Sequence, residues 1–578
     1  MVLPGIARAM TMADEVPNFA MLDAHGRYYE FHRAESRAVV LFFTENGCPV
    51  SRQCIHKLKT IRDQFTEREV AIWVVDANTS DDRKSVLKEA EELGAERVFP
   101  FLRDDTQGLA HLLGVTRTAT VVAIDRKSGH VFYQGAMDDQ FSEGAAKPDP
   151  QQKYLENALQ DFLASRPVKQ PEVPAHGCLI KYEPELTGTN VSYAHDIAPI
   201  LEKHCLSCHS PGNIGPFSMS DYQKVHSKSD MIQEVLLSRR MPPWSADQEL
   251  GHFTQEPTMT LEEKRALLGW IADGARRGEG EDPLPQAHVA PAAYWPLGQP
   301  DFIVKLPKPE EVPATGVLEY RHIKINSPVT EDTWLGAVSI HPGNRKVVHH
   351  CIVRVKSSGR GADDGSGRGM PLQGWAPGYQ SGRFPEGTGR LLPKNSVLDL
   401  EMHYTTMGSP QSDETEIGFY KLPEKPKLVL NTRAAINQDF SIPPGESDAQ
   451  TFAMCPIKAD SQLISMAPHM HLRGSWMRFE ALYANGKRET LLSVPHYDFN
   501  WQTSYRLAQP KILPAGTWVI CSGGFDNSPQ NPNNPAPEKR IAWGDQSFEE
   551  MFIGFLETTA VPEGEHSSQT ASAGAGGQ

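Results

Sequence analysis

Three stretches of this sequence carry three different secondary-structure patterns, and two proline-rich connectors separate them. Residues from about 15 to 165 alternate short β-rich runs, such as AVVLFF, VAIWVVDA and ATVVAID, with helical runs such as DRKSVLKEAEELG. This alternation predicts an α/β domain with a central sheet. Residues from about 191 to 276 have helical patterns, and those from 301 to about 560 have strands between Pro and Gly turns, which indicates β-sandwiches.

The size and charge of the chain narrow the classes of function. A chain of 578 residues is too long for one hydrophobic core. Its net charge of −15 argues against nucleic acid and anionic membrane surfaces as partners. We expect no transmembrane segment, because no apolar run approaches the roughly 20 residues that span a bilayer. The opening MVLPGIARAMTMADEV has no apolar core typical of a signal peptide.

Eight cysteines in such a chain do not make a disulfide scaffold, but four of them form two clusters. In the first, LFFTENGCPVSRQC, Cys48 follows a buried strand and begins a predicted helix, where the helix N-terminus favours the thiolate. Ser51 stands where a C-x-x-C motif has its second cysteine. Cys54 lies six residues along the helix, about 9 Å away, which is too far for a disulfide. The four other cysteines could pair in an oxidising compartment, but the sequence does not show which of them pair: Cys178, Cys351, Cys455 and Cys521.

This stretch, together with YQGAMDD near Tyr133, resembles the thioredoxin-like redoxin family over about 150 residues. The resemblance implies a thioredoxin-like α/β fold. It departs from the redox-active pattern at Ser51 and at Ala119, which stands where the family usually has a cis-proline. Two interpretations stay open, a degenerate docking domain and a redox role for the single thiol of Cys48.

The second cluster, EKHCLSCHSPG, contains the C-x-x-C-H motif in the helical segment. This segment resembles a class I cytochrome c domain, and LLGWIADGA resembles the closing helix of that family. The resemblance implies one haem c per chain, with thioether bonds to Cys205 and Cys208 and His209 as the proximal ligand. Met241, in RRMPPWS, would be the distal ligand. A structural zinc site is the alternative, but it needs a fourth ligand that no paired motif supplies.

The strand-rich region carries a histidine series. NRKVVHHCIVRV contains His349 and His350, LDLEMHYTTMG contains His403, and MAPHMHLRG contains His469 and His471. If MAPHMHLRG is a strand, His469 and His471 share one face, because strand side chains alternate. His349 and His350 are adjacent, so they can share a metal only at a β-bulge or by strong bending of their side chains. Ordinary polar or core histidines are the alternative for the whole series.

In this order, and with Met551 in GDQSFEEMFIGF, the series resembles the copper type II, ascorbate-dependent monooxygenases over about 260 residues. The family includes peptidylglycine α-hydroxylating monooxygenase and dopamine β-monooxygenase. The resemblance implies two copper ions per chain and two jelly-roll-like β-sandwiches. The electron-transfer copper would have His349, His350 and His403 as ligands. The copper that meets O₂ would have His469, His471 and Met551, whose soft thioether favours Cu(I).

Three polar residues that grip the substrate in the peptide-amidating members are replaced here by Ala467, Ile553 and Phe555. A less polar substrate without a carboxylate is therefore the natural expectation.

We predict a multidomain protein: a thioredoxin-like domain (1–168), an all-α cytochrome c-like domain (191–280) and two all-β sandwiches (301–425 and 426–562). Connectors would cover 169–190 and 281–300, and a disordered tail 563–578. A faint repeat joins the two sandwiches: LPKNSVLDLEMHY, which contains His403, aligns with LPAGTWVICSGGF.

The predicted function is a copper monooxygenase that hydroxylates a C–H bond of a small organic substrate with O₂. Its catalytic residues would be His469, His471 and Met551, with Cys48 as a further candidate. Electrons would come through the haem from an external donor, ascorbate or a redox protein. Two alternatives stay open, a thiol-based oxidoreductase or peroxidase using Cys48, and a non-catalytic copper and haem electron carrier. The haem motif implies a periplasmic or extracytoplasmic location.

Overall fold

The computed structural model describes residues 12–142, 145–187, 191–211, 213, 215–254, 258–287, 294–356, 369–376 and 382–562. The chain divides into two compact units. The first comprises Met1–Trp244 and Pro257–Val289, and the second Ser245–Glu256 and Ala290–Gln578. The predicted tail 563–578 lies outside the described residues.

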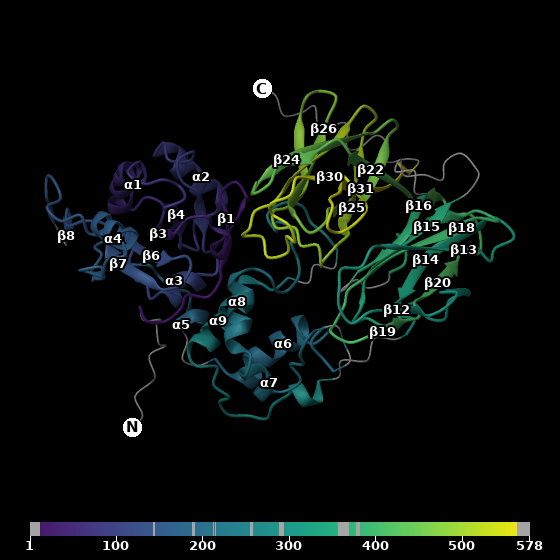
Figure 1. The fold of residues 1–578 in the computed structure, drawn as a ribbon, viewed down its shortest axis with the longest axis horizontal. Coiled ribbons are helices and arrows are strands. Elements are labelled where there is room, and N and C mark those ends of the chain that lie inside the picture. The colour runs from purple at the N-terminus through teal and green to yellow at the C-terminus, as the bar shows by residue number, and fades with distance from the viewer. Residues whose placement is uncertain are drawn as a thin grey trace. The chain divides into compact units, whose positions relative to one another are not determined.

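The first unit contains an α/β domain (purple to blue in Figure 1) built on one mixed sheet, which has eight strands in the described residues. In sheet order these are β10 (Glu172–Val173), β7 (Val131–Ala136), β6 (Thr120–Asp125), β3 (Ala38–Thr44), β4 (Val70–Asp76), β5 (Phe101–Arg103), β1 (Ala20–Asp23) and β2 (Tyr28–Glu30). The other elements of the domain are η1 (Phe31–Arg33), α1 (Pro49–Arg62), α2 (Arg83–Glu92), α3 (Gly108–Leu112), β8 (Phe141–Ser142), β9 (Ala145–Ala146) and α4 (Tyr154–Leu163).

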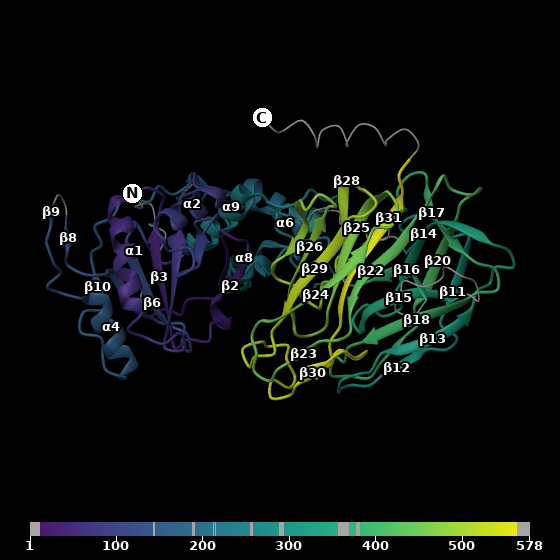
Figure 2. The ribbon, with the colours of Figure 1, turned by 90° about the horizontal axis from the view of Figure 1, so that it is seen from above.

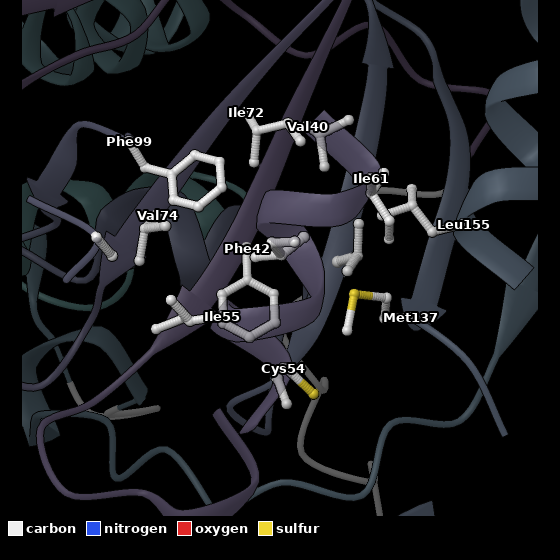
Figure 3. Close-up of a cluster of buried hydrophobic side chains, with 14 of the residues drawn as sticks. Val40, Phe42, Cys54, Ile55, Ile61, Ile72, Val74, Phe99, Met137 and Leu155 are labelled. Carbon is white, nitrogen blue, oxygen red and sulfur yellow. The ribbon is translucent and has the colours of Figure 1, made fainter. Parts of the chain in front are cut away.

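Strand β3 lies at the centre of this sheet because its sequence, AVVLFFT, is apolar on both faces, and all seven residues are buried. It pairs in parallel with β4 and antiparallel with β6. Side chains of α1 pack on one face of these strands, and Figure 3 shows Cys54 and Ile55 of α1 among Phe42, Ile72 and Val74. The predicted α/β sandwich is confirmed.

A series of short helices follows along the chain: α5 (Pro184–Thr187), the π-helical turn η2 (Tyr193–Ile197), α6 (Ala198–His204), α7 (Tyr222–His226), α8 (Ser229–Leu237), α9 (Leu261–Ala272) and η3 (Leu284–Gln286). Helices were predicted for 191–276, so α5 and η3 lie in the predicted connectors. They enclose a small core around Tyr193, Leu201 and Trp270. A capping box between Thr260 and Glu263 fixes the start of α9.

This helical segment shares packing with the α/β domain. Leu237 of α8 and Leu268 of α9 belong to the same buried cluster as Leu109 of α3. The main-chain oxygen of Asp105 accepts a hydrogen bond of 2.7 Å from Arg265, and the carboxylate of Asp105 pairs with Arg239 at 2.5 Å. The two parts are therefore one packed unit.

The structure differs from the predicted boundaries in two places. The described part of the predicted connector 169–190 contains regular structure: β10 joins the sheet beside β7, and the main-chain oxygen of Cys178 accepts a hydrogen bond from the N–H of Thr118. Residues 245–254, predicted in the haem domain, belong to the second unit, where the N–H of Asp247 donates to the oxygen of Ser493 at 2.8 Å. The boundaries were predicted from local composition, which carries no information on main-chain hydrogen bonds between distant segments.

The second unit is all-β in its described residues. Its first half contains a five-stranded sheet, which in order has β11 (Phe302–Lys305), β20 (Glu416–Lys421), β14 (Thr333–His341), β17 (Thr388–Leu392) and β21 (Leu428–Val429). A four-stranded sheet has, in order, β13 (Arg321–Asn326), β18 (Val397–Tyr404), β15 (Val348–Lys356) and β16 (Met370–Trp375). A separate pair joins β12 (Glu310–Val312) and β19 (Gln411–Asp413). Its second half contains two four-stranded sheets. The first has, in order, β22 (Asn431–Asn437), β31 (Phe552–Ala560), β25 (Ser461–His469) and β28 (Tyr505–Leu513). The second has, in order, β24 (Ala449–Pro456), β29 (Trp518–Phe525), β26 (Gly474–Leu482) and β27 (Arg488–Val494), and a separate pair joins β23 (Ser441–Ile442) and β30 (Ile541–Ala542).

The sheets of each half pack as two layers (Figure 2). In the first half, Val338 of β14 and Phe419 of β20 share a buried cluster with Val353 of β15 and Leu400 of β18. In the second, Gly554 of β31 passes so close to β29 that an added Cβ would lie 2.3 Å from the sulfur of Cys521. The predicted large all-β region is confirmed, while its jelly-roll character stays a prediction.

The faint sequence repeat has a structural counterpart. Strand β18 lies second in the sheet β13–β18–β15–β16, and β29 lies second in the sheet β24–β29–β26–β27. Both strands pair antiparallel with both neighbours. The two halves therefore place the repeated segment at the same position in a four-stranded sheet.

Candidate functional site

Three buried histidines gather on two paired strands of the second unit. His349 and His350 lie on β15, and His403 lies on the neighbouring strand β18. The β15–β18 register shifts between Val348 and His350. This irregularity lets the two adjacent histidines reach the same place, as the sequence predicts.

The ring nitrogens of these three histidines converge. Nδ1 of His349 lies 3.2 Å from Nδ1 of His350 and 3.3 Å from Nδ1 of His403. One ring nitrogen from each residue lies within 4.8 Å of the others. With metal–nitrogen bonds of about 2.0 Å at tetrahedral angles, ligand nitrogens lie about 3.3 Å apart. The spacing fits one metal ion held through Nδ1.

Neighbouring side chains orient this cluster, and burial keeps it uncharged. Nε2 of His349 donates to Oδ1 of Asn500 at 3.1 Å, which leaves the Nδ1 lone pair for a metal. The ring of Phe499 stacks on His349 at 4.8 Å between centroids. Burial lowers the pKa of His349 and lowers that of His403 to about 3, so both rings are neutral at ordinary pH.

The second histidine pair lies where β25 ends. His469 is the last residue of β25, and His471 lies beyond the end of that strand. The continuous strand on which the predicted shared face depended is therefore not present across this pair. The centroids of the two imidazole rings are nevertheless 5.4 Å apart. Nδ1 of His469 lies 2.8 Å from Oε1 of Gln502, and Nδ1 of His471 lies 3.3 Å from the main-chain oxygen of Glu549. Since both Nδ1 atoms donate, Nε2 carries the lone pair in each ring.

Two observations bear on a metal at this pair. Nε2 of His471 is buried, and within the described parts of the chain it has no hydrogen-bond partner. Met551 is buried just before β31, and His469 faces Ile553 of β31 in the antiparallel register. Met551 precedes this partner residue by two positions in the chain, and its role as the third ligand stays a prediction.

Glu550 is a site residue that sequence reasoning missed. It is fully buried, and its carboxylate accepts the main-chain N–H groups of His471 at 2.8 Å and of Arg473 at 2.6 Å. Burial raises the pKa of Glu550 to about 8, although these hydrogen bonds oppose the rise. Glu550 fixes the main chain that presents His471.

Two further residues that the sequence did not single out reach both histidine groups. Besides holding His469, the Gln502 amide lies 3.4 Å from Nδ1 of His350. The ring of Tyr320 packs edge-on against His350 and His403 of the first group and against His471 of the second. No pattern in the sequence marks them, because each meets the histidines through long-range packing.

A cavity of about 160 Å³ opens beside both groups. His350, His469 and Gln502 line it, and so do Ala467 and Phe555, two of the replacements noted in the sequence. Leu372 and Trp375 add apolar wall. Arg390 also lines it, but its guanidinium already pairs with Glu557 and donates to Thr432.

In the first unit, Cys48 occupies the N-cap position of α1, and its side chain is buried. Burial tends to raise the pKa of Cys48, but hydrogen bonds to its sulfur from Ser51, Thr118 and Cys178 outweigh burial and lower the pKa to about 7. Cys54 is in the hydrophobic core, and burial raises its pKa to about 12. That Cys54 is too far from Cys48 for a disulfide stays a prediction.

The C-x-x-C-H motif forms a turn after α6. The N–H groups of Cys208 and His209 donate to the main-chain oxygen of Cys205 at 3.1 and 2.8 Å. Nδ1 of His209 lies 3.0 Å from the oxygen of Phe217, which leaves Nε2 for iron. Met241 lies in the turn after α8, and its role as an axial ligand stays a prediction.

Comparison with known proteins assigns only the N-terminal part. Residues 12–133 match the AhpC/TSA family. No curated protein matches the chain. A conserved protein from Geobacillus kaustophilus is 28% identical over 30% of this chain and 92% of its own, with a TM-score of 0.27. A hypothetical protein from Sinorhizobium meliloti 1021 is 24% identical over 30% and 97%, with a TM-score of 0.28.

The thioredoxin domain of a thiol-disulfide oxidoreductase from Bacteroides vulgatus is 15% identical over 27% of this chain and 99% of its own, with a TM-score of 0.21. The family match supports the thiol-based alternative for the N-terminal domain, and supports it better than the copper interpretation of the whole chain. No described helix combines the length and the hydropathy that crossing a bilayer requires.

Proposed function

Starting from the AhpC/TSA match at residues 12–133, we propose that the chain is an oxidoreductase that joins a thiol-active domain to a copper type II monooxygenase. The observation that carries the copper half is the Nδ1 cluster of His349, His350 and His403, with spacings of 3.2 and 3.3 Å. Copper in this cluster and at His469, His471 and Met551 would supply one-electron chemistry and O₂ activation for hydroxylation of a C–H bond.

The protein contributes rigid ligand positions. Asn500 and Gln502 fix the tautomers of His349 and His469 through hydrogen bonds of 3.1 and 2.8 Å. Glu550 holds the main chain of His471. Hydrogen-bond partners of this kind orient the ligands of a metal centre and tune their affinity.

The cavity supports a small and largely apolar substrate. An engineered apolar cavity of about 150 Å³ accepts a molecule of the size of benzene, which sets the scale for the 160 Å³ found here. Leu372, Trp375 and Phe555 offer apolar contact. We do not expect Arg390 to bind a substrate carboxylate, because its positive charge is already paired with Glu557.

Oxygen uptake tests the copper half. Copper-loaded protein with ascorbate and small apolar substrates should consume O₂ and yield a hydroxylated product. His469→Ala should abolish both, whereas His341→Ala, which changes a histidine that packs against Tyr294, should not. Copper binding without substrate-dependent O₂ uptake would leave only an electron carrier.

The C-x-x-C-H turn supports a haem c held by Cys205, Cys208 and His209, with Met241 as the distal ligand. Such a haem would supply an electron-transfer centre in the same chain as the histidine groups. Its covalent attachment implies a location outside the cytoplasm. Replacing both cysteines by alanine should remove the haem absorbance and slow turnover with protein reductants. Unchanged turnover would exclude this electron supply.

Thiol chemistry at Cys48 is the second candidate function, and the family match favours it for the N-terminal domain. Cys48 has the lowered pKa of a reactive thiol at a helix N-terminus. Reduced protein should consume a hydroperoxide or a small disulfide, and Cys48→Ser should abolish that consumption. Equal consumption by Cys48→Ser would leave the domain a docking module.

A further inference from the structure

The segment around Cys178 pairs with the loop before β6. The N–H of Thr118 donates to the oxygen of Cys178 at 2.9 Å, and the N–H of Ile180 donates to the oxygen of Thr116 at 3.0 Å. The N–H of Cys178 also donates to Oγ1 of Thr118 at 2.8 Å. The backbones approach so closely that a Cβ on Gly177 would lie 1.9 Å from the oxygen of Thr118. A larger side chain at this position would clash with the main chain of Thr118, so glycine allows the close approach of the two segments.

This pairing brings two sulfur atoms together. Sγ of Cys178 lies 3.1 Å from Sγ of Cys48, although 130 residues separate them. Thr118 connects the two, because its Oγ1 lies 3.1 Å from Sγ of Cys48 and accepts from the N–H of Cys178. A disulfide has a sulfur–sulfur bond of about 2.05 Å, so the two atoms need to approach by about 1 Å.

We propose that Cys48 and Cys178 are a redox-active dithiol pair, with Cys48 as the attacking thiol and Cys178 as the resolving thiol. The inference rests on the thiol chemistry proposed for Cys48 and adds the residue that completes it. Cys178 lies outside the matched residues 12–133, on a segment predicted as a connector. Cys178 would supply the second thiol that a C-x-x-C motif has at the position of Ser51.

The exchange balances with an external disulfide as the oxidant. The Cys48 thiolate attacks one sulfur of the external disulfide, forms a mixed disulfide and releases one thiolate. Cys178, after losing its proton, attacks the Cys48 sulfur and releases the second thiolate. The protein then holds a Cys48–Cys178 disulfide, and the external disulfide has been reduced to two thiols. Cys178 contributes because its sulfur is already beside Cys48, which raises its effective concentration.

The experiment is oxidation of the reduced full-length chain by glutathione disulfide, followed by acid quench, alkylation and peptide mass spectrometry. The expected product is a peptide pair linked through Cys48 and Cys178, with Cys54 alkylated as an internal control. In Cys178→Ser, Cys48 should instead retain glutathione. In Cys48→Ser, the linked pair should vanish and Cys178 should stay alkylatable.

Three results would overturn the inference. In wild-type protein, glutathione retained on Cys48 with Cys178 free would keep Cys48 reactive but remove the resolving role. No modification of Cys48 at all would overturn both this inference and the thiol function. Since Glu45 lies with these cysteines in a group whose ligand atoms are within 4.8 Å, stoichiometric zinc that survives dialysis and is lost in Glu45→Ala would assign a metal site instead.

Discussion

Nδ1 of His403 lies 3.3 Å from Nδ1 of His349, although 54 residues separate the two along the chain. Strands β15 and β18 bring them together, and the register shift after Val348 turns His350 to the same point. Burying several neutral imidazoles together costs free energy of folding unless their ring nitrogens have partners, because the rings are removed from water. In the proposed function, a metal ion would give these nitrogens a common partner.

Removal of one histidine from this cluster should remove one metal. We expect His403→Ala to bind about one copper per chain instead of about two, because two imidazoles without a third hold copper weakly. Metal analysis after gel filtration measures this. His322→Ala is the matched control: His322 lies on the neighbouring strand β13 and pairs with Asp399, so this variant should keep two. Equal loss in both variants would contradict the assignment.

Asn500 should act on affinity rather than on stoichiometry. Asn500→Ala removes the acceptor that fixes the His349 tautomer, and loss of such a partner typically weakens metal binding about 10–100-fold. Competition with a copper chelator measures the shift. Asn485→Ala, in the exposed turn between β26 and β27, should leave affinity unchanged. An unchanged affinity in Asn500→Ala would show that His349 is not a ligand through Nδ1.

Glu550 should stabilise the fold as well as the site. Glu550→Ala leaves the buried N–H groups of His471 and Arg473 without an acceptor, which should cost about 2–4 kcal/mol. Glu550→Gln keeps an acceptor oxygen and should cost less. Chemical denaturation followed by tryptophan fluorescence measures both. If the two variants are equally stable, the carboxylate does not hold this segment in solution.

Reactivity of Cys48 should follow pH around neutrality. Its pKa is lowered from 9.0 to about 7, so the thiolate fraction, and with it the rate of alkylation by iodoacetamide, should rise with a midpoint near pH 7. Peptide mass spectrometry of briefly alkylated, reduced protein gives this rate. Thr118→Val removes a hydrogen bond to the sulfur and should move the midpoint to higher pH. A wild-type midpoint near 9 would show that the thiolate is not stabilised.

Parts of the fold could be predicted from the sequence because the features that determine them are local. The run AVVLFFT is apolar on both faces, and it forms the central strand β3. The adjacent pair His349 and His350 requires an irregular strand to share a metal, and the structure has that irregularity. Both inferences use only side-chain alternation and hydrophobicity.

The remainder depends on contacts between distant segments. Cys178 was left without a partner in the sequence, because its pairing with Thr118 joins residues 60 apart. Gln502 and Tyr320 reach the histidines from loops that carry no periodic pattern. The segment 169–190 has the composition of a connector, yet β10 completes an edge of the sheet.

Copper per chain, measured after reconstitution of the full-length protein and removal of loosely bound metal, tests the central claim most directly. The account predicts a value near two, falling to near one in His403→Ala and also in His469→Ala, with the two losses independent. A value near zero in the wild-type protein would contradict it. The histidines would then be buried structural residues, and Cys48 with its partner Cys178 would be left as the reactive centre.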